Sequence, residues 1–324
     1  MKISVVTSLY RSAPYIGELH RRCLEAIGKT GADDYEIILV NDHSPADDLA
    51  IAKDLASRDA KVVVIDLSRN FGQHKALLAG LAQASGDHIF MMDSDLEEDP
   101  EWIAQFHVEM KRTGCDVVFG VQQGEKGSFS YRLGRRVFYG LMNRLSDINL
   151  PRNAVTARLM SRRYLDALLE YQEREVFLAG ICHVVGFAQL PVNVIKHDTS
   201  PTTYSLAHVV SVFVNAVTAF TIRPLVAISL IGMSVMLLAF GFTAWVIFRK
   251  IVYGMAVQGW ASVMVAILMI GGMTLFLNGV IAIYIAKIFL EVKQRPMTTV
   301  REVYRADAKA AAAGENLGAL EIDA

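Results

Sequence analysis

The chain has 324 residues, of which 53% are hydrophobic and 20% are charged, and its mean hydropathy is +0.33. An ordinary soluble domain is less apolar and carries about 25% charged residues, so the composition excludes a largely disordered chain and does not fit a wholly soluble protein. The formal net charge of -1 excludes the basic field typical of nucleic-acid binding. The three cysteines, which are odd in number and far apart, predict no disulfide framework and no metal site: Cys23, Cys115 and Cys182.

Apolar runs and helix-like segments alternate along the first part of the chain. The apolar runs predict strands over Lys2–Leu9, Glu36–Val40, Val62–Leu67, His88–Met92 and Val117–Val121. Segments with helical periodicity predict helices over Ile16–Ile27, Ala46–Ser57, Lys75–Ala84 and Pro100–Arg112. Strands that are apolar throughout and alternate with helices indicate an α/β domain with a parallel sheet covered on both faces.

Polar clusters directly follow four of these predicted strands. Ligands of parallel sheets bind at the carboxyl ends of the strands. The candidate site therefore comprises Ser8-Leu9-Tyr10, Asn41-Asp42, Ser68-Arg69-Asn70 and Asp93-Ser94-Asp95.

The acidic cluster at Asp93 and Asp95 is the most informative of the four. Two carboxylates one residue apart at a strand end suit Mg²⁺ or Mn²⁺, which prefer hard oxygen ligands and bind substrate phosphates at the same time. Glu97 lies two residues further on and is a candidate third ligand. The alternative is a run of acidic residues that only stabilises the start of the next helix.

Two long apolar runs follow the α/β domain. Residues 223–290 contain four basic residues and no acidic one, and they include the uncharged runs Leu225–Phe248 and Val263–Ile285. Each run exceeds the roughly 20 residues that cross a bilayer, so two transmembrane helices are predicted. The chain begins without a signal-peptide pattern, and Lys and Arg are more frequent outside the two spans than in the loop between them. We therefore expect residues 1–222 and both termini in the cytoplasm, including the tail 291–324, whose end is expected to be disordered.

Residues 131–163 are rich in arginine. They contain eight arginines and one acid, Asp147, among apolar residues at helical spacing. Such a basic amphipathic segment suits a membrane surface and a lipid phosphate, although a solvated face on a packed helix has the same pattern. A second interfacial helix is predicted over residues 205–222, so the α/β domain is expected over residues 1–204.

Taken together, these motifs resemble the membrane-anchored family-2 glycosyltransferases that act on polyprenyl phosphates. The resemblance covers about residues 1–305. It rests on the stretches ISVVTSLY, EIILVNDHS, LSRNFGQHKALLAGLAQASGD, MMDSDLEEDPEW, ARLMSRRYLDAL and IYIAKIFLEVKQRP. It implies a GT-A fold, which is Rossmann-like with a mostly parallel sheet.

The resemblance also implies an activity: inverting transfer of one sugar from a UDP- or GDP-linked donor to a polyprenyl phosphate, with Mg²⁺ or Mn²⁺. The lipid-linked sugar would serve an envelope glycan such as O-antigen or lipid A, at the bacterial inner membrane. A homo-oligomer, a tetramer in relatives, is implied as well. No nucleic-acid partner is expected.

The implied roles attach to matching positions. Ser8, Tyr10, Asp42, Asn70, Gly72, Lys75 and Asp93 would bind the nucleotide sugar, and the metal would lie on Asp93, Asp95 and Glu97. The residues implied to meet the acceptor phosphate are Arg132, Arg135, Arg136, Arg158 and His197, and those given a catalytic role are Asp95, Arg135, Arg136 and Arg158.

The sequence departs from the family pattern at several positions. Where relatives have Y-N-E after the first strand, this chain has Tyr10-Arg11-Ser12, and Glu97 stands where relatives have Gln. The acidic residue of the family's G-D-F-R-L block is Thr156 here, and the later Arg and Lys of R-x-x-G-x-[ST]-K-Y are His197 and Thr203. These changes leave a non-catalytic membrane scaffold open as an alternative. A polysaccharide synthase of the same superfamily is a second alternative, although such synthases usually have more spans and a Q-x-x-R-W motif, which this chain lacks.

Overall fold

The computed structural model describes residues 1–123, 153–174, 176–197, 223–253 and 259–305. The chain divides into two units. The first comprises residues 1–134, 150–203 and 295–324, and the second comprises residues 135–149 and 204–294. Residues 131–152 of the predicted basic segment 131–163, and the predicted interfacial helix at 205–222, lie outside the described residues.

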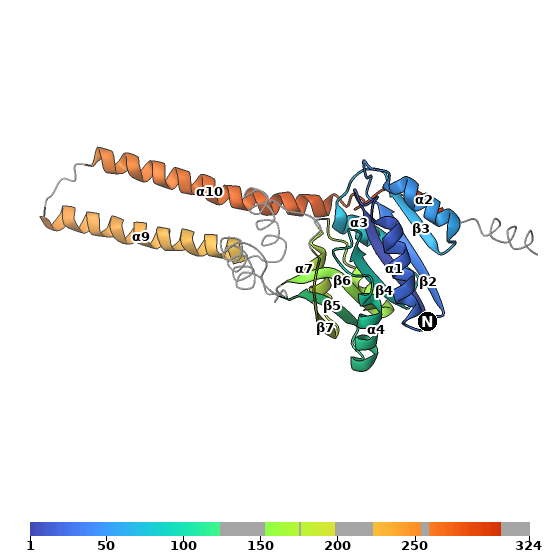
Figure 1. The fold of residues 1–324 in the computed structure, drawn as a ribbon. Coiled ribbons are helices and arrows are strands. Elements are labelled where there is room, and N and C mark those ends of the chain that lie inside the picture. The colour runs from blue at the N-terminus through green and yellow to red at the C-terminus, as the bar shows by residue number, and fades with distance from the viewer. Residues whose placement is uncertain (124–152, 175, 198–222, 254–258, 306–324) are drawn as a thin grey trace, which may run out of the picture. The chain divides into compact units, whose positions relative to one another are not determined.

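An eight-stranded mixed sheet forms the centre of the first unit (Figure 1). The strand order is β7-β5-β6-β4-β1-β2-β3-β8. Strand β1 runs parallel to β2 and β4, β2 to β3, and β5 to β7, whereas β6 and β8 run antiparallel to their neighbours. The prediction of a mostly parallel α/β sheet is confirmed. The strands are β1 (Lys2–Leu9), β2 (Asp34–Asn41), β3 (Val62–Leu67), β4 (His88–Asp93), β5 (Val117–Gln122), β6 (Ala154–Ser161), β7 (Gln189–Val194) and β8 (Val300–Arg305).

Helices pack on both faces of this sheet. Helix α1 shows why: its buried residues Ile16, Leu19, Cys23, Ala26 and Ile27 recur at helical spacing and so form one apolar stripe. The four helices predicted before residue 113 are all present, with ends that differ by a few residues. The helices of the first unit are α1 (Ile16–Gly28), α2 (Asp48–Arg58), α3 (Gln73–Leu81), α4 (Trp102–Thr113), α6 (Arg162–Leu169) and α7 (Leu178–Val184).

Two apolar cores result, one on each face of the sheet. Val5 of β1 belongs to the core formed with α1, α2 and α4, whereas Val6 belongs to the core formed with α3, α6 and α7. Successive side chains of a strand point to opposite faces. Because both faces are covered, strands such as β3 and β4 are apolar at most positions, which is why the sequence predicted them.

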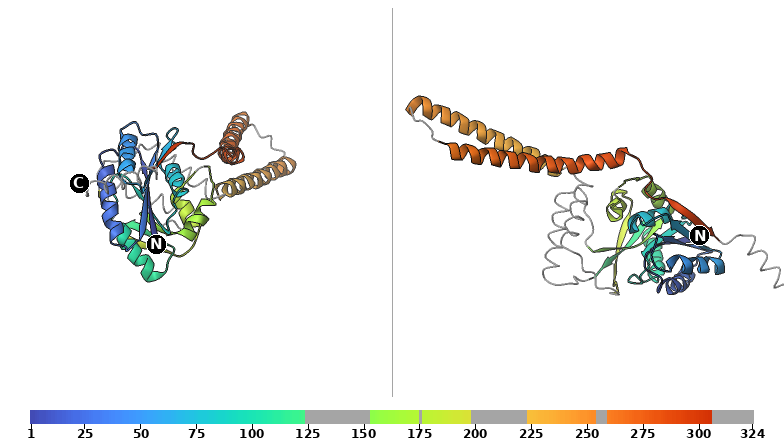
Figure 2. Two further views of the ribbon diagram at one scale, coloured as in Figure 1. Left: turned by 90° about the vertical axis from the view of Figure 1, so that its right-hand side faces the viewer. Right: turned by 90° about the horizontal axis from the view of Figure 1, so that it is seen from above.

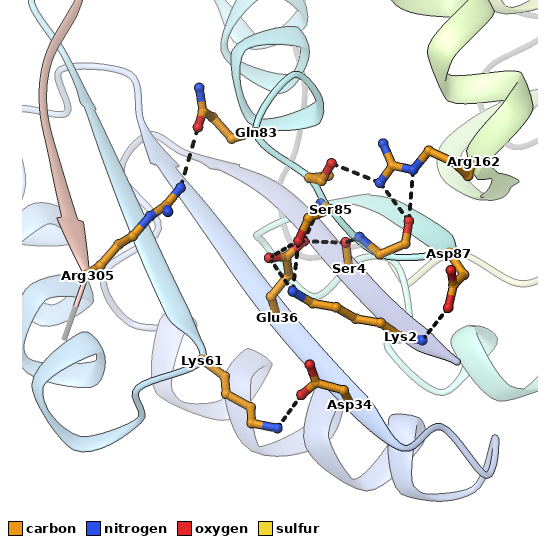
Figure 3. A network of polar contacts seen from close by, with 12 residues as sticks. Lys2, Ser4, Asp34, Glu36, Lys61, Gln83, Ser85, Asp87, Arg162 and Arg305 are labelled. Atoms are coloured by element: carbon orange, nitrogen blue, oxygen red, sulfur yellow. Dashed lines mark hydrogen bonds and ion pairs between the residues drawn. The ribbon is translucent and has the colours of Figure 1, made fainter. Parts of the chain in front are cut away.

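A polar network joins the segments at the amino ends of the strands (Figure 3). Glu36 of β2 is buried and accepts hydrogen bonds from Ser4 Oγ (2.6 Å), Lys2 Nζ (3.1 Å) and the backbone N–H of Ser85 (2.6 Å). Arg162 donates to the backbone carbonyls of residues 84 and 86. These contacts satisfy polar groups at this end of the sheet; the predicted site lies at the opposite, carboxyl end.

The segment after the apolar helices returns to the sheet, which the sequence did not predict. Residues 300–305 were expected only as part of a cytoplasmic tail, yet they form β8, which pairs antiparallel with β3 at the sheet edge, drawn in red in Figure 2. Most side chains of β8 are exposed. Without an apolar run, the strand carries little local signal. The end of the tail after Ala306, which was expected to be disordered, lies outside the described part of the chain.

The second unit contains two long apolar helices, α9 (Arg223–Tyr253) and α10 (Trp260–Val292). Large apolar side chains on both are widely exposed, for example Phe240 and Leu275, which is the surface expected of helices in lipid. Within the described residues, one helix, Met269–Val292, is long and apolar enough to cross a membrane. In α9 the apolar stretch found is the shorter Leu230–Phe242. The predicted span Leu225–Phe248 therefore stays a prediction.

Candidate active site

Asp93 ends β4 at the carboxyl edge of the sheet and gathers side chains from three other segments. Its Oδ1 accepts a hydrogen bond from Gln73 Nε2 of α3 (2.5 Å), and its Oδ2 accepts one from Thr156 Oγ1 of β6 (3.1 Å). The Lys196 ammonium lies 3.6 Å from the same Oδ2. Burial raises the pKa of the Asp93 carboxyl, and the Lys196 charge opposes that shift. The aspartate is therefore a partly enclosed anion with an internal counter-charge.

Lys196 joins Asp93 to a second predicted ligand. Its Nζ lies 3.1 Å from Glu97 Oε2, and the backbone N–H of His197 donates to the Glu97 carbonyl (2.9 Å). Burial disfavours the charged lysine, but the charges of Asp93, Glu98 and Glu97 outweigh burial and raise the pKa of Lys196. Lys196 is therefore held as a cation between two carboxylates.

Glu98 holds the loop that carries Asp93, Asp95 and Glu97, here called the acidic loop. It is fully buried, and its two carboxylate oxygens accept the backbone N–H groups of Asp93 (3.1 Å) and Thr156 (2.9 Å). Burial, followed by the nearby Asp93 charge, raises the pKa of Glu98 to about 8. Glu98 thus fixes the end of β4 to β6, and its role is to hold the backbone on which Asp93 is displayed.

Asp42 organises the loop that leads into α3. Its carboxylate accepts the backbone N–H groups of Phe71 (2.7 Å) and Gly72 (2.9 Å), and its carbonyl accepts Asn70 Nδ2 (3.3 Å). Burial raises the pKa of Asp42, while the two N–H donors act in the opposite direction. Asp42, Asn70 and Gly72, all predicted to bind the donor, therefore lie together, with the carboxylate of Asp42 directed at the loop.

The end of β1 contacts the loop after β4. Ser94 Oγ donates to the carbonyl of Ser8 (2.8 Å) and lies 2.6 Å from Ser12 Oγ. Tyr10, by contrast, is 46% exposed. The structure thus brings Ser8 beside the acidic loop and leaves the Tyr10 ring available at the surface.

Whether the predicted metal ligands suit a metal ion can be judged from their present contacts, because two of them already contact the Lys196 ammonium. Asp93 and Glu97 both direct a carboxylate oxygen at the Lys196 ammonium, whereas Asp95 Oδ1 accepts the backbone N–H of Glu97 (3.0 Å). In the described part of the chain, no group of three or more His, Cys, Asp or Glu side chains is arranged as a metal site. The oxygen donors of Asp93 and Glu97 still suit Mg²⁺ or Mn²⁺, which can take one or two protein carboxylates and complete their shell with substrate phosphates.

The residues predicted for the acceptor phosphate are less fully placed. Arg132, Arg135 and Arg136 lie outside the described residues. Arg158 lies in β6, where it is 6% exposed and its Nε donates to the Thr156 carbonyl (3.3 Å). The His197 side chain is well exposed, and its Nε2 lies 3.1 Å from Asp99 Oδ2. The contact of these residues with a phosphate stays a prediction.

Lys75, another predicted donor residue, lines a cavity of about 220 Å³ on the α3 side of the sheet. The other lining residues are mostly apolar and include Leu78, Leu169 and Met297. Asp93 is not among the lining residues. Lys75 therefore lies on α3, which follows the loop of Asn70 and Gly72, here called the donor loop. It is not one of the side chains that surround Asp93.

Four residues at this site were missed as site residues by sequence reasoning: Gln73, Glu98, Thr156 and Lys196. Lys196 follows β7 by two residues, so a strand prediction for Gln189–Val194 would have added it to the polar clusters at strand ends. Thr156 was noted only as a lost acid, but its hydroxyl contacts Asp93 directly. No sequence pattern pointed to Glu98 as a buried residue, because a run of acidic residues before a helix is typical of a solvated helix start.

Known proteins are similar to this chain along most of its length. Residues 4–169 match the model of Glycosyl transferase family 2. A Mycobacterium tuberculosis (strain CDC 1551 / Oshkosh) protein described as a glycosyltransferase is 41% identical over 95% of this chain and 90% of that protein. A prophage-derived bactoprenol glucosyl transferase of Shigella flexneri is 31% identical over 94% of this chain and 99% of that protein. An undecaprenyl-phosphate 4-deoxy-4-formamido-L-arabinose transferase of Edwardsiella ictaluri is 29% identical over 94% and 95%, respectively.

Proposed function

The chain belongs to glycosyltransferase family 2, and on this basis we propose that it transfers one sugar from a nucleotide-sugar donor to a polyprenyl phosphate at the inner face of a bacterial cytoplasmic membrane. One observation carries the proposal. An acidic loop and a donor loop meet at the carboxyl edge of the sheet, through Gln73 and Asp93, in a chain that also has a long exposed apolar helix. The names of the Shigella flexneri and Edwardsiella ictaluri relatives, which specify bactoprenol or undecaprenyl phosphate, support the acceptor class.

The donor side of the proposed site uses the residues around Asp42 and Asp93. Ser8, Tyr10 and Asp42 would bind the nucleoside, while the loop of Asn70 and Gly72, with Lys75, would position the sugar and its diphosphate. When bound to Asp93, Asp95 and Glu97, Mg²⁺ or Mn²⁺ would offset negative charge on the leaving diphosphate. The protein's own contribution is positioning and charge stabilisation.

A phosphate acceptor would explain how catalysis is possible with Thr156 in place of the acidic residue of the family pattern. A sugar hydroxyl needs a general base near neutral pH, but a phosphate monoester has a second pKa of about 6 and is mostly dianionic already. A phosphate oxygen then forms the new bond to the anomeric carbon, on the face opposite the diphosphate. The bond to the diphosphate breaks, and the nucleoside diphosphate leaves with the electron pair, so the configuration inverts. Arg132, Arg135, Arg136, Arg158 and His197 are the proposed acceptor-phosphate residues.

We extend the proposal to the membrane. Helix α9 is proposed as a second span beside α10, with the catalytic unit and both termini in the cytoplasm and residues 205–222 along the interface. The chain is further proposed to form a homo-oligomer. These features would present the soluble donor and the lipid phosphate to one site.

The test is a panel of radiolabelled UDP- and GDP-sugars incubated with undecaprenyl phosphate and membranes that contain the chain. We expect label from one donor in the lipid phase, dependent on Mg²⁺ or Mn²⁺, and none with the D95N variant. Label in a water-soluble polymer would instead support a polysaccharide synthase. Transfer by D95N at the wild-type rate would overturn the proposed mechanism.

A further inference from the structure

The Lys196 ammonium occupies the place between two proposed metal ligands. It lies 3.6 Å from Asp93 Oδ2 and 3.1 Å from Glu97 Oε2. The three side chains are only 14–22% exposed, so bulk water screens the ion pairs weakly. A diffusible cation that reached both carboxylates would have to enter the position that the lysine holds.

The backbone keeps Lys196 in this position. It follows the end of β7 closely, and the next residue, His197, donates its backbone N–H to the carbonyl of Glu97 (2.9 Å). The lysine and the acidic loop are therefore tied together by their main chains as well as by charge. Such a tethered cation acts at a high effective concentration, unlike a competitor in solution.

From this geometry we propose that Lys196 is a built-in competitor of the divalent cation, and that the cation gains Asp93 and Glu97 only when the lysine is drawn away. The diphosphate of the donor is the anion that would attract it. Metal and nucleotide binding are then coupled through one side chain: the chain alone holds the metal weakly, and the nucleoside diphosphate strengthens that binding. The inference rests on the proposed function only through the use of a divalent cation and a diphosphate donor.

The coupling follows from electrostatics. Two cations cannot share a pair of carboxylates without strong mutual repulsion. A ligand that stabilises one of two states shifts the equilibrium by its differential affinity. By linkage, a nucleotide that favours the displaced lysine raises the metal affinity by the same factor by which the metal raises the nucleotide affinity.

The experiment measures Mn²⁺ binding to the full detergent-solubilised chain, from the free-Mn²⁺ electron paramagnetic resonance signal, first alone and then with UDP or GDP. The K196M variant, which keeps the length of the side chain without the charge, is expected to bind Mn²⁺ at least about tenfold more tightly than wild type in the absence of nucleotide. The nucleotide is expected to strengthen binding clearly in wild type and little in K196M. Unchanged or weaker Mn²⁺ binding by K196M would overturn the inference.

Two further variants act as controls. K61M removes an ammonium that pairs with Asp34 at the opposite end of the sheet, so it should bind Mn²⁺ as wild type does. K196R keeps the positive charge and should retain weak binding; binding as tight as in K196M would contradict the charge-based explanation. If the melting temperature shows that K196M does not fold, K196Q takes its place in the same comparison.

The outcomes separate this inference from the proposed function. Sugar transfer to polyprenyl phosphate together with unchanged Mn²⁺ affinity in both K196M and K196Q would refute the role of Lys196 alone. Tighter Mn²⁺ binding in K196M without transfer by the wild-type chain to any lipid phosphate would refute the acceptor alone.

Discussion

The carboxylate of Asp42 accepts the backbone N–H of Gly72 at 2.9 Å, and this contact fixes the start of α3. Gly72 has φ +92, a conformation that side chains rarely adopt, although a Cβ there would meet no atom within 4 Å. The next residue, Gln73, donates to Asp93. The donor loop and the acidic loop are therefore aligned through the backbone of a glycine.

The variant G72A tests this alignment. It is expected to lower the free energy of unfolding by about 1–2 kcal/mol through backbone strain and to weaken nucleotide binding, because Gln73 no longer reaches Asp93 in the same geometry. Thermal unfolding and calorimetry with UDP or GDP measure the two effects. G17A is the matched control: Gly17 lies within α1 and has open space around it, so alanine should be neutral or slightly stabilising. Equal effects of both variants would contradict the explanation.

The D93N variant is expected to lower sugar transfer by about 100-fold or more. The substitution removes the charge that faces Lys196 and the proposed cation while leaving the shape of the side chain. Initial rates of label transfer to lipid measure the effect. D54N is a suitable control, because Asp54 is half-exposed and pairs with Arg58 on the surface of α2. Near-normal transfer by D93N would show that its carboxylate is dispensable.

Arg301 anchors the C-terminal strand to the sheet. It donates to Asp66 Oδ2 (3.2 Å) and to the Ser68 carbonyl (2.9 Å), and Asp66 is buried. R301M is expected to destabilise the first unit by about 1–2 kcal/mol, because a buried carboxylate loses its cationic partner. R305M on the same strand removes only a 3.5 Å contact with Gln83 and should shift the melting temperature of the solubilised chain much less. Similar shifts in melting temperature for both variants would mean that any change in β8 has this effect, and not specifically the loss of the Arg301–Asp66 pair.

The burial of His107 leads us to expect that the stability of the folded chain depends on pH. It is buried, neither ring nitrogen has a hydrogen-bond partner among the described residues, and burial, with the charges of Lys111 and His88, lowers its pKa to about 4. Between its ordinary pKa of about 6.5 and pH 4, the unfolded chain binds a proton that the folded chain does not. Stability should therefore fall as the pH drops through this range.

The H107L variant is expected to lose this part of the pH dependence. Melting temperatures of wild type and variant, compared at about pH 7 and about pH 5, give the measurement. The difference between the two pH values should be smaller in H107L. An equal acid-induced loss in both proteins would place the sensitivity at other groups.

Much of the first unit could be predicted because its signals are local. The strand Val62–Leu67 is buried at every position and apolar at all but Asp66, and α1 repeats its apolar residues at helical spacing. The same logic located Asp42 and Asp93, since polar residues that directly follow such strands lie at the binding edge of a parallel sheet. The apolar helices were also evident from length and composition.

The amino-acid sequence by itself thus determined the alternating strands and helices, the positions of the acidic and donor loops, and the apolar character of residues 225–285. Only the tertiary structure decided that Lys196 lies between Asp93 and Glu97, that Glu98 is buried beneath them, and that β8 completes the sheet. The reason is physical. A local pattern reflects which side chains face a core, whereas an ion pair or an edge strand depends on partners that are brought together from distant parts of the chain.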